Sequence, residues 1–260
     1  MSSHLPAPAM PGFPRFFKFG GYWVNSYRVF LCVGIYVGTL ATAAAAEGSG
    51  LSPLRIGLGA AACALGGLVG ARLYHVLLRA PAYIRRRSWR ALWDLDQGGW
   101  SVLGAPLTFV PVSLAVAGLL HLPAAVFFDH MALGVVAGGF WIRLGCVFNG
   151  CCAGRETQGW LGVRLHDTRG VRKRRIPVQF LEMAWWALGL IAFLWLWPTP
   201  FPQGSYALGV LGGYGVGRFF LEPLREGPNV VFGGVRVNQM VAALLALVAG
   251  GALVIRAGRP

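Results

Sequence analysis

The chain has 260 residues, of which 56% are hydrophobic and 12% are charged. A soluble globular domain carries about 25% charged residues, so this composition excludes an ordinary soluble protein and indicates a polytopic membrane protein. The net charge of +14 is distributed between apolar segments and comes with no nucleic-acid recognition motif. The expected partner is therefore anionic lipid, and no nucleic-acid partner is expected.

The N-terminal segment before residue 26 has no long apolar run and no small-residue cleavage site, so we expect it to be retained. Since a membrane-crossing helix needs about 20 mostly apolar residues, the rest of the chain is expected to form about seven transmembrane helices. They are expected at residues 25–46, 56–78, 101–120, 124–148, 177–197, 206–222 and 238–255. The predicted fold class is thus an all-α membrane protein, with residues 1–260 in a single polytopic membrane domain.

Two polar segments interrupt these apolar runs. Residues 79–97 interleave arginines with tyrosine and tryptophan, whose stems and rings suit the headgroup layer while their polar tips stay wet. We expect an interfacial arm there, with an ordinary solvated loop as the alternative. Residues 150–176 end in a basic run and are long enough for a small extramembrane insert, with short strands around residues 162–165.

Ionisable residues inside membrane spans are candidates for a functional site, because burying them is costly. Arginine can hold a phosphate through two parallel hydrogen bonds and keeps its charge when buried. Arg143 and Arg218 therefore suit a lipid phosphate. The alternative is that each pairs with a carboxylate only to permit burial, as Arg218 would with Glu222. The full set is Arg72, His75, Arg143, Glu182, Arg218 and Glu222, accompanied by Tyr27 and Tyr214.

The sixth expected span has two ordered faces. Its glycines recur at every fourth residue, which predicts close contact with another helix. A phenol, a guanidinium and a carboxylate also recur at every fourth residue, so they share a second face. The glycines are Gly209, Gly213 and Gly217, and the polar residues are Tyr214, Arg218 and Glu222.

Three of the five cysteines lie close together, at positions 146, 151 and 152. Zinc sites usually combine C-x2-4-C pairs with histidines, and this spacing does not match, so no metal is expected. A reactive thiol or a disulfide is a second interpretation, because the neighbouring Arg143 and Arg155 would lower a thiol pKa. The third interpretation is that the three cysteines are small packing residues.

The segment from residue 143 to 155 resembles the signature of bacterial prolipoprotein diacylglyceryl transferases, which runs approximately R-x-G-N-F-x-N-x-E-x-x-G. The residues that fit are Arg143, Gly145, Asn149, Gly150 and Gly154. Further pieces fall in the order of the family, at residues 25–27, 67–72, 98–101, 177–182, 214–222 and 238–239. The resemblance therefore covers nearly the whole chain.

This resemblance implies transfer of a diacylglyceryl group from phosphatidylglycerol to the thiol of a lipobox cysteine in a prolipoprotein, at the bacterial inner membrane and without a cofactor. The sulfur attacks a glycerol carbon and glycerol phosphate leaves, so cations must stabilise the departing charge. By position, Arg143, Arg218 and Glu222 would be catalytic, with both arginines on the phosphate and Glu222 orienting Arg218. The implied substrate-binding residues are Tyr27, Asn149, Gly154, Tyr214, Arg72 and Gln179.

The chain departs from the family pattern in three places. The S-F-H-G-G segment of the family reads S-V-L-G-A at residues 101–105, and Leu103 cannot move a proton in place of the histidine. Cys146 and Cys151 replace the first asparagine and the glutamate of the signature, and Arg28 replaces a glycine. One alternative is therefore that the diacylglyceryl group is transferred to an acceptor other than a lipobox cysteine. A second is that the protein is a lipid-binding or partner-binding membrane protein that kept the fold and lost the catalytic activity.

Two lines of reasoning disagree on orientation. The side that carries the arm and the insert holds most of the basic residues, and the positive-inside rule places that side in the cytoplasm. The family places its active face outside the cytoplasm. We follow the resemblance, because the additional arginines can gather anionic headgroups.

Overall fold

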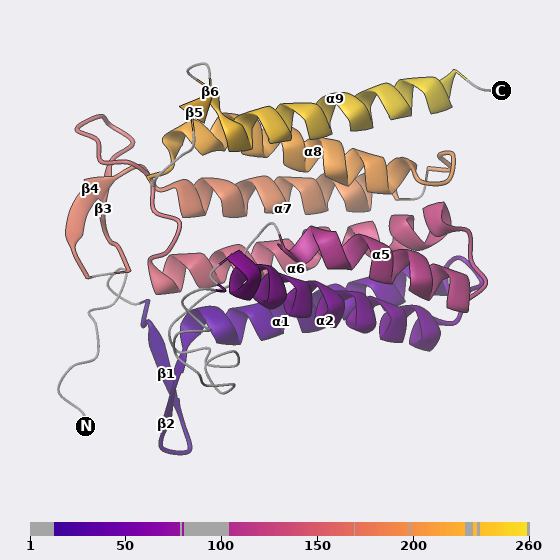
Figure 1. The fold of residues 1–260 in the computed structure, drawn as a ribbon, viewed down its shortest axis with the longest axis horizontal. Helices are drawn as coiled ribbons and strands as arrows, with labels where there is room; N and C mark the ends of the chain where they lie inside the picture. The colour runs from indigo at the N-terminus through magenta and orange to yellow at the C-terminus, as the bar shows by residue number, and fades with distance from the viewer. Residues whose placement is uncertain are drawn as a thin grey trace.

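The structure is a computed structural model that describes residues 13–78, 80, 104–168, 170–197, 199–226, 231–232 and 235–258. Apart from residue 80, the expected interfacial arm at residues 79–97 lies outside this part of the chain, as does Leu103. The helices described below form one bundle, and its axes run in about the same direction (Figure 1).

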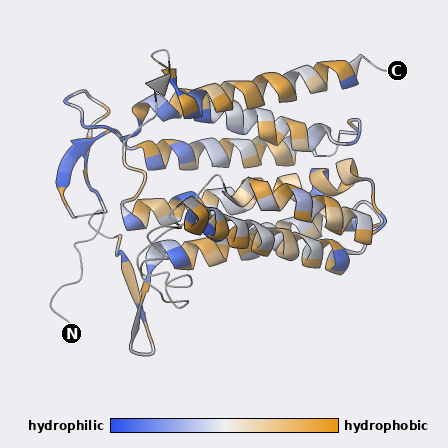
Figure 2. Cartoon of the chain, viewed as in Figure 1, coloured by the Kyte–Doolittle hydropathy of each residue, from blue (hydrophilic) through white to orange (hydrophobic). Residues whose placement is uncertain are grey.

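Long apolar helices make up the bundle, and Figure 2 shows hydrophobic residues along most of their length. Their bounds are α1 (Ser26–Glu47), α2 (Pro53–Leu78), α5 (Gly104–Leu119), α6 (Ala124–Asn149), α7 (Val178–Leu196), α8 (Ser205–Leu221), the 3-10 turn η1 (Glu222–Leu224) and α9 (Val237–Ala257). Within the described residues, α1, α2, α6, α7 and α9 are long and apolar enough to cross a membrane. A helical, multi-pass membrane protein is thus supported.

The expected count of about seven spans is not confirmed, because two helices are short. The described part of α5 has 16 residues and adjoins residues 101–103, which are not described. α8 has 17 residues and gives way to η1, where Pro223 follows Glu222. Proline lacks a backbone N–H and clashes with the preceding turn, which accounts for the end of α8 at this point.

Three antiparallel hairpins lie at one end of the bundle (Figure 1). Their strands are β1 (Phe16–Phe19) with β2 (Tyr22–Asn25), β3 (Val163–His166) with β4 (Arg172–Arg175), and β5 (Val231–Phe232) with β6 (Val235–Arg236). The short strand expected around residues 162–165 is therefore confirmed as β3. Hydrophilic residues gather in β3 and β4, as Figure 2 shows.

Local sequence sets two helix ends that meet at the same end of the bundle. The side chain of Asn25 accepts a hydrogen bond from the backbone N–H of Tyr27 at 2.9 Å, which caps the start of α1. Gly150 adopts a left-handed φ of 72° and ends α6. The amide of Asn25 also donates to Oδ1 of Asn149 at 2.9 Å, so the start of α1 is fixed to the end of α6.

Glycines bring α1 and α6 into close contact. A Cβ added to Gly38 would lie 2.7 Å from the carbonyl oxygen of Gly134, and one added to Gly34 would lie 2.8 Å from that of Gly138. Any side chain at these positions would force the helices apart. This contact fixes the position of α6, which carries Arg143.

The expected helix contact through the glycine face of α8 is wrong for two of the three glycines. A Cβ on Gly209 or Gly213 would meet no atom within 4 Å, whereas one on Gly217 would lie 2.3 Å from the Trp185 indole nitrogen. The close contact with α9 is instead made by Gly215, whose added Cβ would lie 2.7 Å from the carbonyl oxygen of Ala242. The regular spacing indicated helix packing correctly but selected the wrong face.

Candidate functional site

Glu182 is the centre of a cluster of charged side chains at the end of the bundle that carries the hairpins. Its Oε2 lies 3.0 Å from Nη1 of Arg143, and its Oε1 lies 3.1 Å from Nη1 of Arg218 and 3.0 Å from Nη1 of Arg225. The three arginines come from α6, α8 and the segment after η1. One carboxylate on α7 therefore holds three guanidinium groups from separate parts of the chain.

A second carboxylate, that of Glu222, fixes the orientation of Arg218. Its Oε2 lies 2.8 Å from Nη2 of Arg218, and its Oε1 accepts a hydrogen bond of 2.8 Å from the amide of Asn238 on α9. The backbone carbonyl of Glu222 accepts from Arg236. Arg218 is thus held between Glu182 and Glu222, and few orientations remain open to it.

The cluster carries more positive than negative charge. It contains four guanidinium groups and two carboxylates, an excess of two positive charges. The carboxylates lie underneath, since the side chains of Glu182 and Glu222 are 6% and 2% exposed, while Arg143 and Arg218 are 19% and 18% exposed. The arginines are therefore paired with carboxylates, which permits their burial, and are still accessible to an external anion. The two interpretations from the sequence, phosphate binding and ion pairing, are thus compatible.

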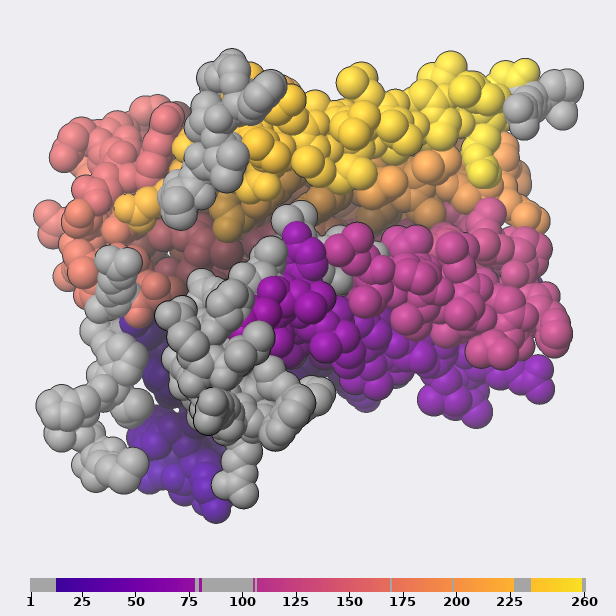
Figure 3. Space-filling model, in the orientation of Figure 1, coloured from indigo at the N-terminus to yellow at the C-terminus, as the bar shows by residue number. Residues whose placement is uncertain are grey.

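An apolar cavity of about 290 Å³ reaches this cluster from within the bundle. Arg143 is part of its lining, together with Gly34, Gly38, Phe109, Ile142 and Trp186. A second apolar cavity, of about 520 Å³, lies between α6, α7 and α8 and is lined by Trp185, Trp186, Phe201 and Tyr214. Figure 3 shows a hollow on one face of the molecule, between α9 and the pair formed by α2 and α5.

This arrangement fits an amphiphilic anion, with its charged group on the arginines and its apolar part between the helices. The comparison with known families agrees with this geometry. A family model described as prolipoprotein diacylglyceryl transferase matches residues 14–255. The chain belongs to the prolipoprotein diacylglyceryl transferase family.

Relatives from several bacteria support the same assignment. A phosphatidylglycerol–prolipoprotein diacylglyceryl transferase from Tropheryma whipplei is 28% identical over 95% of this chain and 93% of its own length. One from Bordetella parapertussis is 31% identical over 75% of each chain. A second enzyme of this name from Streptomyces coelicolor is 34% identical over 74% of this chain and 63% of its own length.

The candidate site residues differ in how close they lie to the cluster. Arg143, Arg218 and Glu222 meet there. Asn149 binds Asn25, and the amide of Gln179 donates to the carbonyl oxygen of Cys151 at 3.0 Å, so both stabilise the end of α6 and the loop after it.

Tyr27 and Tyr214 both lie within electrostatic range of Arg143, and Arg72 lies on α2. Tyr27 packs against Gly145, whose added Cβ would lie 3.5 Å from the tyrosine ring. Tyr214 lies one turn before Arg218 on α8 and lines the larger cavity. Arg72 is buried in α2 with 4% exposure.

Gly154 has a structural role that the signature alone did not show. A Cβ on it would lie 2.1 Å from the carbonyl oxygen of Ile176, so no side chain fits there. Gly154 forms an antiparallel bridge with Arg225, flanked by a hydrogen bond of 2.9 Å from the N–H of Arg155 to the carbonyl of Leu224. This backbone pairing positions Arg225 beside Glu182.

Sequence reasoning missed Arg225 and Arg236 and did not assign Glu182 to the site. The signal for Arg225 was its position three residues after Glu222, at the end of a span that already carried three candidates. Glu182 was among the ionisable residues of the spans, and only the fold shows that three arginines meet on it.

The three clustered cysteines adjoin the arginines. Cys146 is buried at the end of α6, while Cys151 and Cys152 lie partly exposed in the following loop, and all three are free thiols. Hydrogen bonds from the other two thiols, together with Arg225 and Arg143, hold the pKa of Cys152 well below its usual range. Burial alone would lower the pKa of Arg225, but Cys152 and Glu182 raise it above its usual value.

Proposed function

We propose that this chain transfers the diacylglyceryl group of phosphatidylglycerol to the thiol of a lipobox cysteine in a prolipoprotein. The names of its relatives state this activity for them. The observation in this chain that supports it is the shared carboxylate of Glu182, which brings Arg143 and Arg218 together. Two guanidinium groups that are held on one carboxylate can both bind the same lipid phosphate.

The donor would lie with its phosphate on Arg143 and Arg218 and an acyl chain in the apolar cavity that Arg143 lines. The acceptor thiol gives its proton to water, and its sulfur forms a bond to the glycerol carbon while the bond from that carbon to the phosphate oxygen breaks. The electron pair goes to glycerol phosphate, whose leaving oxygen gains negative charge. Arginines that are already oriented stabilise this charge without reorganising, which lowers the barrier.

The remaining site residues have supporting roles in this proposal. Glu222 orients Arg218, and Glu182 fixes the spacing of the arginines. Asn149, Gln179 and Gly154 stabilise the loop after α6, next to which the donor headgroup would bind. Tyr27, Tyr214 and Arg72 would contact the donor farther from its phosphate.

The placement in the cell follows from the same proposal. We assign residues 1–260 to one domain in the bacterial inner membrane, with the arm at residues 79–97 in the headgroup layer and the insert at residues 150–176 outside the membrane. The end that carries the arginine cluster would face away from the cytoplasm, where secreted precursors arrive.

The direct test is a transfer assay with purified protein, labelled phosphatidylglycerol and a lipobox peptide. The expected product is a peptide thioether that carries the label, and a peptide with serine in place of cysteine is the control. Phosphatidylglycerol binding without any transfer would contradict the enzymatic proposal. That result would favour the lipid-binding function, which the replacement of the family histidine by Leu103 already suggests.

A further inference from the structure

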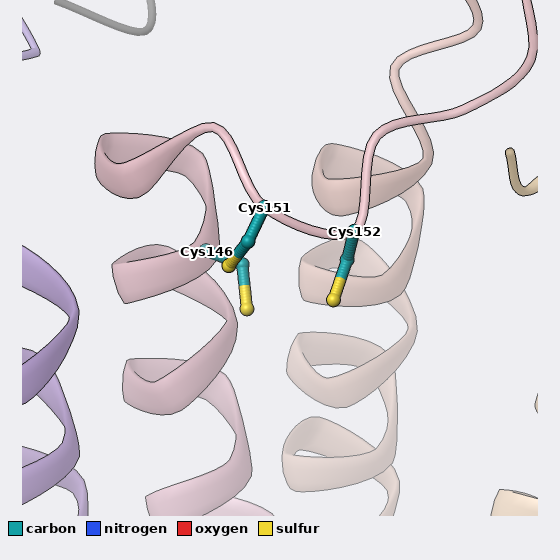
Figure 4. A group of neighbouring side chains, drawn as sticks. All are labelled: Cys146, Cys151 and Cys152. Carbon is teal, nitrogen blue, oxygen red and sulfur yellow. The ribbon is translucent and has the colours of Figure 1, made fainter. Parts of the chain in front are cut away.

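Cys146, Cys151 and Cys152 come together closely enough to act as one group. Their sulfur atoms all lie within 4.8 Å of one another. Figure 4 shows the three thiols below the loop that follows α6, with their sulfur atoms turned to the same side. Gly150 and Cys152 both adopt a left-handed φ, of 72° and 60°, which turns this loop back sharply. Such a conformation is costly for a non-glycine residue and persists where the surroundings hold it.

The spacing of the sulfur atoms suits a thiophilic cation. A Zn–S bond of about 2.3 Å with tetrahedral angles requires sulfur atoms about 3.8 Å apart, so each thiol needs to move by less than about 1 Å. Soft thiolate ligands select zinc, cadmium and similar cations over magnesium and calcium, which require oxygen ligands. Within the described part of the chain, these three cysteines are the one group of three or more cysteine, histidine or acidic side chains that lie close enough together to hold a metal ion.

The charge of the surroundings also favours such a complex. Three thiolates and one divalent cation carry a net charge of −1. The neighbouring arginine cluster has an excess of two positive charges, and Arg143 and Arg225 both interact electrostatically with Cys152. An anionic thiolate complex is therefore stabilised here, whereas a bare cation held by neutral ligands would be repelled.

We propose that Cys146, Cys151 and Cys152 bind a thiophilic divalent cation through their three sulfur atoms and leave its fourth position to an external thiol. Three protein ligands with one open position are typical of catalytic zinc sites, and closed sites with four ligands are typical of structural ones. The partial exposure of Cys151 and Cys152 gives an external ligand access.

The external thiol would be that of the acceptor peptide, and this part of the inference depends on the proposed function. A thiol that coordinates a cation releases its proton to water and becomes the nucleophilic thiolate. The position beside Arg143 would place that thiolate next to the bound lipid phosphate. Coordination would thus deprotonate the acceptor, a task for which the sequence has leucine at the position of the family histidine.

The cation site can be tested with Co(II) and Cd(II) alone, in the absence of lipid and peptide. We expect the full chain to bind one equivalent, with a thiolate-to-metal charge-transfer absorption, and to protect the three thiols from alkylation. Replacing any one of them by serine should weaken binding by at least about 10-fold. The matched controls are Cys32→Ser and Cys63→Ser, which should bind like the wild type.

Two results would overturn the cation site. One is wild-type protein with no charge-transfer absorption at stoichiometric metal. The other is a serine variant of the cluster that binds as tightly as the wild type. Thermal unfolding in detergent serves as the check that each variant has folded, and Cys→Ala replacements repeat the test if a serine variant fails this check.

The role of the fourth position is tested by adding a lipobox peptide to the Co(II)-loaded protein. The spectrum should change with the cysteine peptide and stay unchanged with the serine peptide. No change with either peptide would overturn the acceptor role. Because no lipid is present, this measurement does not depend on transfer: an intact spectral change with no transfer would refute the proposed function and leave the cation site standing.

Discussion

Arg218 on α8 and Glu182 on α7 form an ion pair of 3.1 Å, and the same carboxylate also holds two other arginines. Removing the charge of Glu182 therefore affects three guanidinium groups at once. This relationship gives the first prediction.

Glu182→Gln should lower both thermal stability and transfer. The change leaves three partly buried arginines to repel each other, and breaking a buried ion pair from one side costs on the order of 3 kcal/mol. We expect a lower unfolding temperature in detergent and a transfer rate reduced by at least about 10-fold. The matched control is Glu156→Gln, because that carboxylate is 49% exposed and pairs with Lys173 away from the cluster. Equal effects of the two changes would contradict the central role of Glu182.

Arg143→Ala and Arg218→Ala should each abolish measurable phosphatidylglycerol binding and reduce transfer by about 100-fold or more, the usual loss when an oriented donor to a developing charge is removed. Arg143→Lys and Arg218→Lys should recover only part of the binding, since lysine lacks the two parallel hydrogen bonds of arginine. The exposed Arg155, changed to lysine, is the control and should behave as the wild type. Full recovery by lysine would show that charge alone, without geometry, binds the lipid.

Gly154→Ala should displace Arg225 from Glu182 without removing any charge from the arginine cluster. The new Cβ would lie 2.1 Å from the carbonyl oxygen of Ile176, so the pairing of this loop with the segment that carries Arg225 has to shift. We expect transfer to fall by about 10-fold or more, since an error of about 1 Å in placement has effects of this size. Gly48→Ala, where the added Cβ meets nothing within 4 Å, is the comparison. Normal transfer by the Gly154 variant would mean that Arg225 is dispensable.

Gly38→Ala should destabilise the contact between α1 and α6. Its added Cβ would lie 2.7 Å from the carbonyl oxygen of Gly134, and overpacking of this kind costs about 1–3 kcal/mol. Gly250→Ala on α9 faces open space and should be neutral or slightly stabilising, because alanine is the better helix former. Thermal unfolding of the two variants in the same detergent compares them directly, and equal unfolding temperatures would show that the helices can separate at no cost.

The sequence allowed the helices and part of the site to be predicted, because these depend on local patterns. Apolar runs placed each of the seven α-helices that the structure describes to within a few residues of its described ends. The regular spacing at the end of α8 put Arg218 and Glu222 on one face. The number of membrane spans was less predictable. Length alone does not tell whether a helix as short as α8 crosses the membrane.

Contacts between distant segments were harder to predict from the sequence. Arg225 reaches Glu182 only because the loop at Gly154 pairs with the segment after η1, and no local pattern indicates that pairing. The cysteines present the same difficulty. The spacing of residues 146, 151 and 152 matches no standard metal motif, and their proximity follows from the two left-handed residues in the loop.

Trp186 belongs to the lining of both apolar cavities, and Gly139 leaves room for its ring, since a Cβ there would lie 2.8 Å from the indole. The indole therefore lies between the two cavities, one lined by Arg143 and the other by Tyr214. If it moved aside, the two cavities would connect. The position of this one side chain would then decide how much connected apolar space the bundle offers to an acyl chain.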